Sequence, residues 1–190
     1  MHSESLGVRD AWVFTPTQHH DSRGTFLEWF TARSLAEHTG HTFDLAQANY
    51  SVSSKGVLRG IHYADVPPGQ AKYVTCVAGA VLDVVVDLRV GSPTFGQWDS
   101  VLLDTTDRRS IYIPVGLGHA FVSLQDSSTV AYFCSTAFNP TAEHEVNPLD
   151  PEIAIAWPTD IELVLSEKDR QAPSLAQALE LGMLPTYPTT

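Results

Sequence analysis

Glycine and proline punctuation is the feature that most limits how this chain can fold. Twelve glycines and twelve prolines are distributed along the 190 residues, and the stretches between them are short and rich in Val, Ile, Tyr and Phe. Such stretches favour strands, because β-branched and aromatic side chains pack well on a pleated surface while Gly and Pro favour turns. Strands at short, regular spacing predict a sandwich or barrel. We expect them at residues 98–103, 110–113, 119–124 and 129–136.

The clearest pair of strands is predicted on either side of the dipeptide Ala78-Gly79. A strand at 72–77 enters this turn and a strand at 80–89 leaves it, so we expect a β-hairpin. Two short helices are also predicted. One covers 32–39 and ends at Gly40, and the other covers about 175–181 with Ser174 as its N-cap.

Acidic residues interrupt the apolar alternation of the strand at 80–89. Asp83 and Asp87 fall on the same face, together with Arg89. A polar side chain inside a barrel is costly to bury unless it is paired or used. These carboxylates are therefore either ligand contacts or members of structural ion pairs with Arg89 or Lys72.

The composition indicates one globular domain. Hydrophobic residues make up 43% of the chain and charged residues 17%, which is typical of globular proteins. The formal net charge of −11 repels nucleic acid and anionic membranes at long range, so we expect neither as a partner. No apolar run approaches the roughly 20 residues that span a bilayer. The two cysteines, Cys76 and Cys134, lie inside apolar runs. We expect both to be packing residues and the protein to be cytoplasmic.

Two motifs carry residues suited to chemistry on an anionic substrate. The first is Gly56-Val57-Leu58-Arg59-Gly60-Ile61-His62, in which Arg59 suits an anion and His62 suits proton transfer. Taken alone, His62 is more readily explained as a structural histidine. The second, at 113–119, contains Pro-x-Gly-x-x-His and resembles half of the signature of the cupin superfamily of small barrels. Metal-binding cupins carry His-x-His where this chain has His62-Tyr63-Ala64, so no metal is expected.

Six blocks, in the same order, resemble one cupin family. These are residues 21–28, 47–49, 56–62, 92–96, 113–116 and 165–169. The family is that of the dTDP-4-dehydrorhamnose 3,5-epimerases of deoxysugar biosynthesis. The resemblance implies an all-β cupin double-stranded β-helix, a jelly-roll barrel with short peripheral helices. We expect a single domain over 1–190, with a core at about 21–158 and a C-terminal segment, 159–190, that contributes Asp169 and a short helix.

The resemblance also assigns catalytic roles. A C4 ketone acidifies the C3 and C5 hydrogens of a sugar, so epimerisation needs a base on one face, a proton donor on the other, and a group that stabilises the enolate. The resemblance implies that His62 is the base, Asp169 its partner, Tyr132 the donor and Lys72 the cation near the C4 oxygen. From the residues alone, Asp169 would be taken for a surface residue and Tyr132 for a core aromatic.

The remaining family matches concern binding of the nucleotide sugar. Arg59 and His119 are implied for the diphosphate, and Gln47 and Asn49 for sugar and phosphate contacts. Phe138 lies where the family often carries tyrosines near thymine. The resemblance also places Arg23, Phe26 and Glu28 near the nucleotide that is bound by a neighbouring subunit. It therefore implies a homodimer with an exchanged N-terminal strand.

The sequence thus predicts an isomerase, without a cofactor, that inverts C3, C5 or both in dTDP-4-dehydro-6-deoxy-D-glucose. The segments 63–72 and 182–187 are closer to the antibiotic-sugar branch of the family, some members of which epimerise only C3 or only C5. A dTDP-sugar 3,4-ketoisomerase on the same barrel is the nearest alternative. A metal-dependent cupin oxygenase and a non-catalytic sugar-binding barrel are the alternatives from other functional classes.

Overall fold

Two antiparallel sheets form the body of the protein in a computed structural model, which describes residues 1–188. The last two residues of the expected domain therefore lie outside the described residues. The six-stranded sheet has the order β1 (His2–Ser5), β2 (Trp12–Thr15), β10 (Ser110–Ile113), β7 (Lys72–Ala78), β12 (Ser128–Cys134) and β5 (Gln47–Ser53). The five-stranded sheet has the order β13 (Glu143–Glu145), β6 (Leu58–Ala64), β11 (Leu117–Ser123), β8 (Ala80–Asp87) and β9 (Trp98–Asp104).

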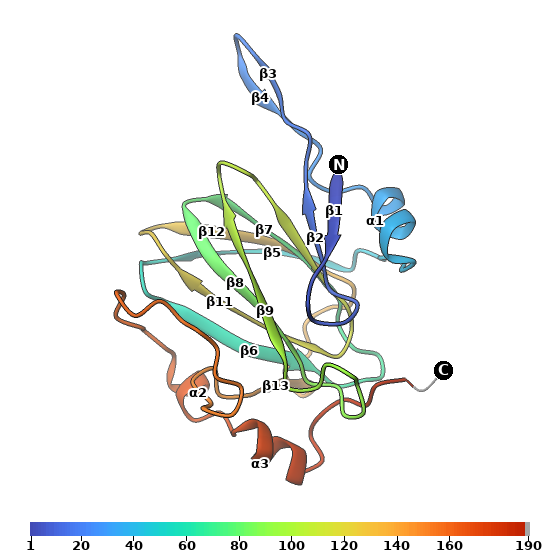
Figure 1. The fold of residues 1–190 in the computed structure, drawn as a ribbon, viewed down its shortest axis with the longest axis vertical. Helices are drawn as coiled ribbons and strands as arrows, with labels where there is room; N and C mark the ends of the chain where they lie inside the picture. Colours follow the sequence, from blue (N-terminus) through green and yellow to red (C-terminus); the bar gives the residue numbers. More distant parts are fainter. Residues whose placement is uncertain (189–190) are drawn as a thin grey trace.

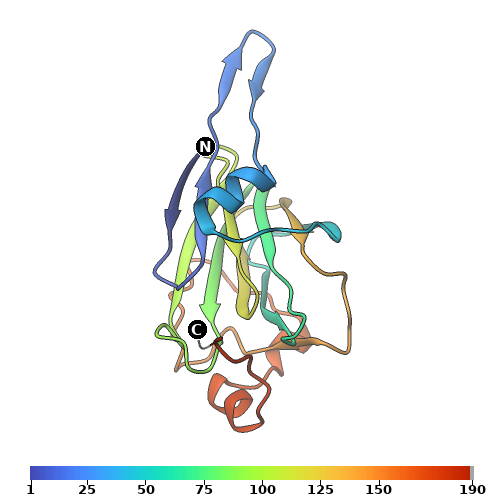
Figure 2. The ribbon, with the colours of Figure 1, turned by 90° about the vertical axis from the view of Figure 1, so that its right-hand side faces the viewer.

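The two sheets face each other, and the peripheral elements lie at the ends of this barrel (Figure 1). A small hairpin of β3 (His19–Asp21) and β4 (Gly24–Phe26) extends away from the body, as the turned view in Figure 2 also shows. Helix α1 (Ala32–Thr39) lies near the base of this hairpin. Helices α2 (Glu167–Arg170) and α3 (Leu175–Glu180) lie at the opposite end of the molecule.

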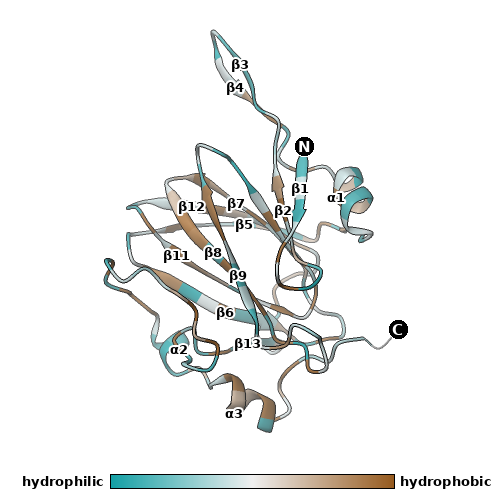
Figure 3. Cartoon of the chain, in the orientation of Figure 1, coloured by the Kyte–Doolittle hydropathy of each residue, from teal (hydrophilic) through white to brown (hydrophobic). Residues whose placement is uncertain are grey.

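Alternating apolar side chains fill the space between the sheets. Val74 and Cys76 of β7 pack in one cluster with Val81 and Val85 of β8 and with Val130 of β12. In Figure 3 the barrel strands carry most of the apolar colouring, whereas the extended hairpin and α2 are largely hydrophilic. Both cysteines are free and buried, as expected of packing residues.

The predicted fold class is confirmed, and most predicted elements are found. Strands β9, β10, β11 and β12 match the predicted ranges to within two residues at each end. Helix α1 ends at Gly40, and α3 begins at its predicted cap, Ser174, whose hydroxyl accepts a hydrogen bond from Gln177 N. None of the helices among residues 1–188 has the length and apolar character that crossing a membrane requires.

The predicted hairpin at residues 72–89 is wrong. Strands β7 and β8 follow each other directly, but β7 pairs with β10 and β12 whereas β8 pairs with β11 and β9. The connection at Gly79 therefore passes from one sheet to the other. Apolar alternation did not reveal this, because both faces of β8 are covered: Val84 and Val86 pack on the outer side and Val81 and Val85 on the inner side.

The ion-pair interpretation of Asp87 is confirmed. Its carboxylate accepts hydrogen bonds from the buried Arg89 at 2.9 Å and from the hydroxyls of Ser92 and Thr94. Burial by itself raises the pKa of Asp87, but these hydrogen bonds outweigh it and the pKa is lowered. Asp87 is thus a structural carboxylate.

Candidate active site

A cavity of about 110 Å³ lies between the two sheets and is lined by side chains from five strands. The lining residues are Ser51, Arg59, His62, Lys72, His119, Phe121 and Tyr132. Strand register explains why they meet: His62 of β6 is the direct neighbour of His119 of β11, and Lys72 of β7 lies one strand from Tyr132 of β12. The two histidines therefore belong to one sheet, and Lys72 and Tyr132 to the other.

His62 forms a hydrogen-bonded pair with Asp169. The distance between His62 Nε2 and Asp169 Oδ1 is 2.7 Å, and the side chains are 37% and 5% exposed, respectively. Ser166, the N-cap of α2, donates its hydroxyl to Asp169 Oδ2 at 2.8 Å. Burial raises the pKa of Asp169, but the hydrogen bonds from His62 and Ser166 outweigh it, so the pKa is lowered. A buried carboxylate thus orients an imidazole whose other side remains accessible.

Two glycines of the 56–62 motif allow this segment to lie very close to the backbone of two other segments. A Cβ on Gly56 would lie 2.1 Å from the carbonyl oxygen of Glu162, and one on Gly60 would lie 2.4 Å from that of His119. Both glycines have positive φ, which other residues rarely adopt. Because Gly56 allows close packing, the backbone of Val164 forms hydrogen bonds with the backbone on either side of Val57. These hydrogen bonds hold the segment before α2 against β6.

His119 forms a second histidine–carboxylate pair, with Asp83. Its Nε2 lies 2.9 and 3.1 Å from the two Asp83 oxygens, and both residues are buried. Burial raises the pKa of Asp83, although His119 and Lys72 act in the opposite direction. The alternative pairing of Asp83 with Lys72 is not found within the described residues, where the Asp83 ion pair is made with His119.

Lys72 and Tyr132 face the histidines from the six-stranded sheet. Desolvation lowers the pKa of Lys72, against the opposing influence of Glu143, Cys134 and Asp83. Burial raises the pKa of Tyr132. Tyr132 therefore keeps its phenolic proton at neutral pH, and Lys72 loses its proton more readily than an ordinary lysine.

The inner face of β5 continues the polar lining. Gln47 Nε2 donates to Asn49 Oδ1 at 2.8 Å, and Gln47 Oε1 accepts a hydrogen bond from the backbone N–H of Phe138. Arg59 is exposed and donates its Nε–H to Ser53 Oγ at 3.2 Å. Two of the predicted binding residues, Gln47 and Asn49, therefore lie on β5, and two more, Arg59 and Phe138, form hydrogen bonds with side chains of β5.

The other predicted nucleotide contacts lie elsewhere. Arg23 is on the extended β3–β4 hairpin and forms an ion pair with Asp21, and Phe26 on the same hairpin is 68% exposed. Phe26 and Glu28 border two other surface cavities and not the one that holds His62. Phe26 and Glu28 therefore do not line the cavity of their own chain, and the expected contribution to a neighbouring subunit stays a prediction.

A family model described as dTDP-4-dehydrorhamnose 3,5-epimerase matches residues 5–177. The chain belongs to this family. It is 60% identical over 187 residues to a dTDP-4-dehydrorhamnose 3,5-epimerase of Mycolicibacterium smegmatis, covering 98% of this chain and 92% of the relative. It is 53% identical to a dTDP-4-dehydro-6-deoxyglucose 3-epimerase of Streptomyces bikiniensis, with 96% of this chain and 93% of that protein covered.

Solved structures of family members superpose closely on the chain. An epimerase from Mycobacterium tuberculosis gives a TM-score of 0.96 at 53% identity, covering 98% of this chain and 94% of that one. The 3'-monoepimerase from Streptomyces bikiniensis in complex with dTDP-quinovose gives a TM-score of 0.94 at 53% identity, covering 98% and 93%. The family thus includes close relatives named for inverting one centre and relatives named for inverting two.

Sequence reasoning missed three residues in or near this cavity. Ser51 and Phe121 line the cavity, and Glu143 of β13 lies close enough to influence the pKa values of Lys72 and Tyr132. Ser51 could have been predicted from its spacing, because it lies two residues from Asn49 and side chains at that spacing share one face of a strand. Glu143 lies on a strand of three residues, too short to show any periodicity.

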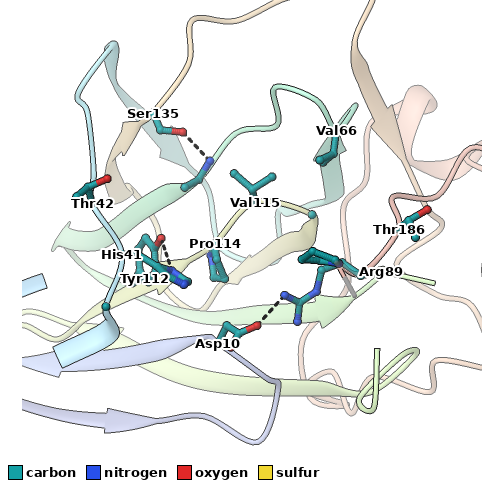
Figure 4. A pocket seen from close by; sticks show the side chains of 14 residues that line it. Asp10, His41, Thr42, Val66, Arg89, Tyr112, Pro114, Val115, Ser135 and Thr186 are labelled. Carbon is teal, nitrogen blue, oxygen red and sulfur yellow. Dashed lines mark hydrogen bonds and ion pairs between the residues drawn. The ribbon is translucent and has the colours of Figure 1, made fainter. Parts of the chain in front are cut away.

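A larger cavity of about 590 Å³ lies outside the site and contains none of the predicted residues (Figure 4). Its Arg89 donates to Asp10 Oδ2 at 2.9 Å, and His41 Nδ1 lies 3.0 Å from the Tyr112 hydroxyl. Its charged groups are therefore engaged with one another. Within residues 1–188 there is also no group of three or more His, Cys, Asp or Glu side chains placed to hold a metal ion, and the expectation of a metal-free enzyme stays a prediction.

Proposed function

We propose that this protein is a dTDP-sugar epimerase that inverts C3, C5 or both in dTDP-4-dehydro-6-deoxy-D-glucose through an enolate. The observation that carries the proposal is the His62–Asp169 pair, which shares one small cavity with Lys72 and Tyr132 of the opposite sheet. Membership of the epimerase family supports the substrate class.

The first step is removal of a proton from the carbon beside the ketone. His62 takes this proton on the ring nitrogen that does not bond to Asp169, while Asp169 holds the ring orientation and stabilises the imidazolium that forms. The electron pair of the broken C–H bond forms a double bond to C4, and the π electrons of the carbonyl move onto the C4 oxygen. Protonated Lys72 stabilises that oxyanion, a role in which a half-buried cation is more effective than one in water.

Inversion requires the proton to return from the opposite face. Tyr132 is suited to this because it belongs to the other sheet and its raised pKa keeps it protonated. A planar enolate between the sheets then has His62 on one side and the phenol on the other. The resulting phenolate regains a proton from solvent and the His62 imidazolium releases one to solvent, so the enzyme returns to its starting state.

The binding residues divide the substrate between the barrel and its rim. Exposed Arg59 takes the diphosphate, and Gln47 and Asn49 contact sugar and phosphate oxygens. Phe138, which is 60% exposed, offers a ring to thymine. His119 contributes from inside the cavity, where Asp83 holds its Nε2 and leaves Nδ1 for the substrate.

We further propose a cytoplasmic homodimer in which the β3–β4 hairpin is exchanged. The hairpin extends away from its own barrel (Figures 1 and 2). Its Arg23, Phe26 and neighbouring Glu28 supply a cation, an aromatic ring and a hydrogen-bond acceptor of the kind a nucleotide needs. Sedimentation of the purified chain is expected to give twice the monomer mass, and deletion of residues 19–26 is expected to weaken nucleotide binding.

Incubation with the 4-keto sugar in deuterated water tests the catalytic proposal. NMR should show deuterium at C3, at C5 or at both, with inversion at each labelled centre and the ketone still at C4. Label at one centre alone would identify a 3-only or 5-only epimerase. A ketone found at C3 would identify the ketoisomerase alternative and refute the proposal.

A further inference from the structure

The hydroxyl of Ser51 is a buried polar group that has no hydrogen-bond partner within residues 1–188. Side chains at alternate positions of β5, namely Gln47, Asn49, Ser51 and Ser53, line its inner face. Gln47 bonds to Asn49, and Ser53 Oγ accepts the Arg59 Nε–H. Ser51 Oγ is inaccessible to solvent and has no hydrogen-bond partner among the described residues.

An unpaired buried hydroxyl opposes folding, because its hydrogen bonds to water are lost without replacement. Ser51 is half-buried and lies outside the hydrophobic core, however. It borders the cavity that holds His62, Lys72 and Tyr132, and it lies two residues along β5 from Asn49, the direct neighbour of Tyr132. A hydrogen-bonding group of the substrate is therefore the partner that this position indicates for Ser51 Oγ.

We propose that Ser51 Oγ hydrogen-bonds the C2 hydroxyl of the hexose and selects sugars that carry it. The inference rests on the proposed function, which places the hexose in this cavity. Chemistry narrows the choice of sugar oxygen. The C4 oxygen faces Lys72, and C6 of a 6-deoxyhexose carries no oxygen. The C3 hydroxyl changes direction when C3 is inverted, so a fixed group cannot hold it in both substrate and product.

The C2 hydroxyl differs because its carbon takes no part in the reaction. A hydrogen bond from Ser51 to this oxygen is retained in the substrate, the enolate and the product. Such a bond holds the ring while the configuration changes at C3, C5 or both. A 2-deoxy sugar would leave Ser51 unpaired in the complex, which sets a preference of roughly tenfold in kcat/KM for the 2-hydroxy sugar.

The test compares two substrates, dTDP-4-dehydro-6-deoxy-D-glucose and its 2-deoxy analogue, with the wild-type protein and two variants. Ser51→Ala is expected to lower kcat/KM for the 2-hydroxy sugar about tenfold and to leave that for the 2-deoxy sugar within about twofold. The control is Ser110→Ala. Ser110 is a buried serine of β10 that lies on the opposite face of the strand from the core residue Ile111. This variant is expected to keep the wild-type ratio of the two kcat/KM values.

Thermal unfolding separates this role from a structural one. Removing an unpaired hydroxyl is expected to leave the Tm of the free Ser51→Ala protein unchanged or raised. A Ser51→Ala protein that keeps the wild-type preference, or that loses kcat/KM equally for both sugars, would overturn the inference. A wild-type protein that exchanges no proton with either sugar would instead refute the proposed function, and the inference would fall with it.

Discussion

Replacing Asp169 by Asn tests the central pair of the site. The change keeps the size of the side chain and removes the negative charge that faces His62 Nε2 at 2.7 Å. Asp169 is 4% exposed, so water cannot easily take over its role. Ser166 still lies beside the new amide and keeps its position as the N-cap of α2.

The size of the effect follows from the hydrogen bond that is lost. A hydrogen bond to a charged group contributes about 1.5–3 kcal/mol, and about 1.4 kcal/mol corresponds to a factor of ten. This bond strengthens when His62 becomes an imidazolium, so its loss appears mainly in kcat. We expect kcat to fall about 10- to 10²-fold, with a smaller change in KM.

Solvent exchange provides the assay. The rate of deuterium incorporation into the 4-keto sugar at saturating substrate is measured for the wild-type protein, for Asp169→Asn and for Glu167→Gln. Glu167 is the matched control, because it is an exposed carboxylate on the same helix, and its amide is expected to change the rate less than about twofold. An Asp169→Asn rate within twofold of wild type would refute the role of Asp169 in assisting His62.

Four further outcomes are expected. Lys72→Met should lower kcat by about 10²- to 10³-fold with little change in KM, as measured by steady-state kinetics, because it removes the group facing the oxyanion; a loss seen only in KM would contradict this. Tyr132→Phe should keep proton abstraction by His62 but slow formation of the inverted product about 10²-fold, so deuterium should appear with retention of configuration; unchanged inversion by NMR would exclude Tyr132 as donor. Arg89→Met leaves Asp87 buried without its cation and should destabilise the protein by about 3–5 kcal/mol in urea unfolding, whereas a loss under 1 kcal/mol would show that water or Ser92 and Thr94 suffice. Because the pKa of Asp169 is lowered in the folded protein, its ionised carboxylate stabilises the fold above the ordinary carboxyl pKa of about 3.9, and this stabilisation is lost as pH falls through the folded pKa. The Tm of wild type should therefore exceed that of Asp169→Asn at neutral pH, and the difference should shrink in acid. A Tm difference that does not depend on pH would contradict this linkage.

Local sequence determined where most elements lie and what chemistry the chain carries. Helix α1 and the cap of α3 depend on residues within four positions of each other, so Gly40 and Ser174 were enough to predict them. The strands β9 to β12 follow from short apolar runs between turn residues. The motif at 56–62 pointed to Arg59 and His62 by residue type, whereas Asp169 was predicted only from the resemblance of the chain, including the block at 165–169, to a family.

Tertiary structure decided which of these residues meet. Strands β7 and β8 read as a hairpin in sequence but belong to different sheets, because strand pairing depends on partners such as β11 and β12 that lie far along the chain. Asp169 is 107 residues from His62, and Asp83 pairs with His119 from a neighbouring strand. The unpaired hydroxyl of Ser51 is likewise visible only once every nearby donor and acceptor has a position. Sequence therefore determined which chemical groups the chain carries and where its local elements lie. Long-range packing determined which of these groups contact one another, because a hydrogen bond requires a separation of about 3 Å in space whatever the separation along the chain.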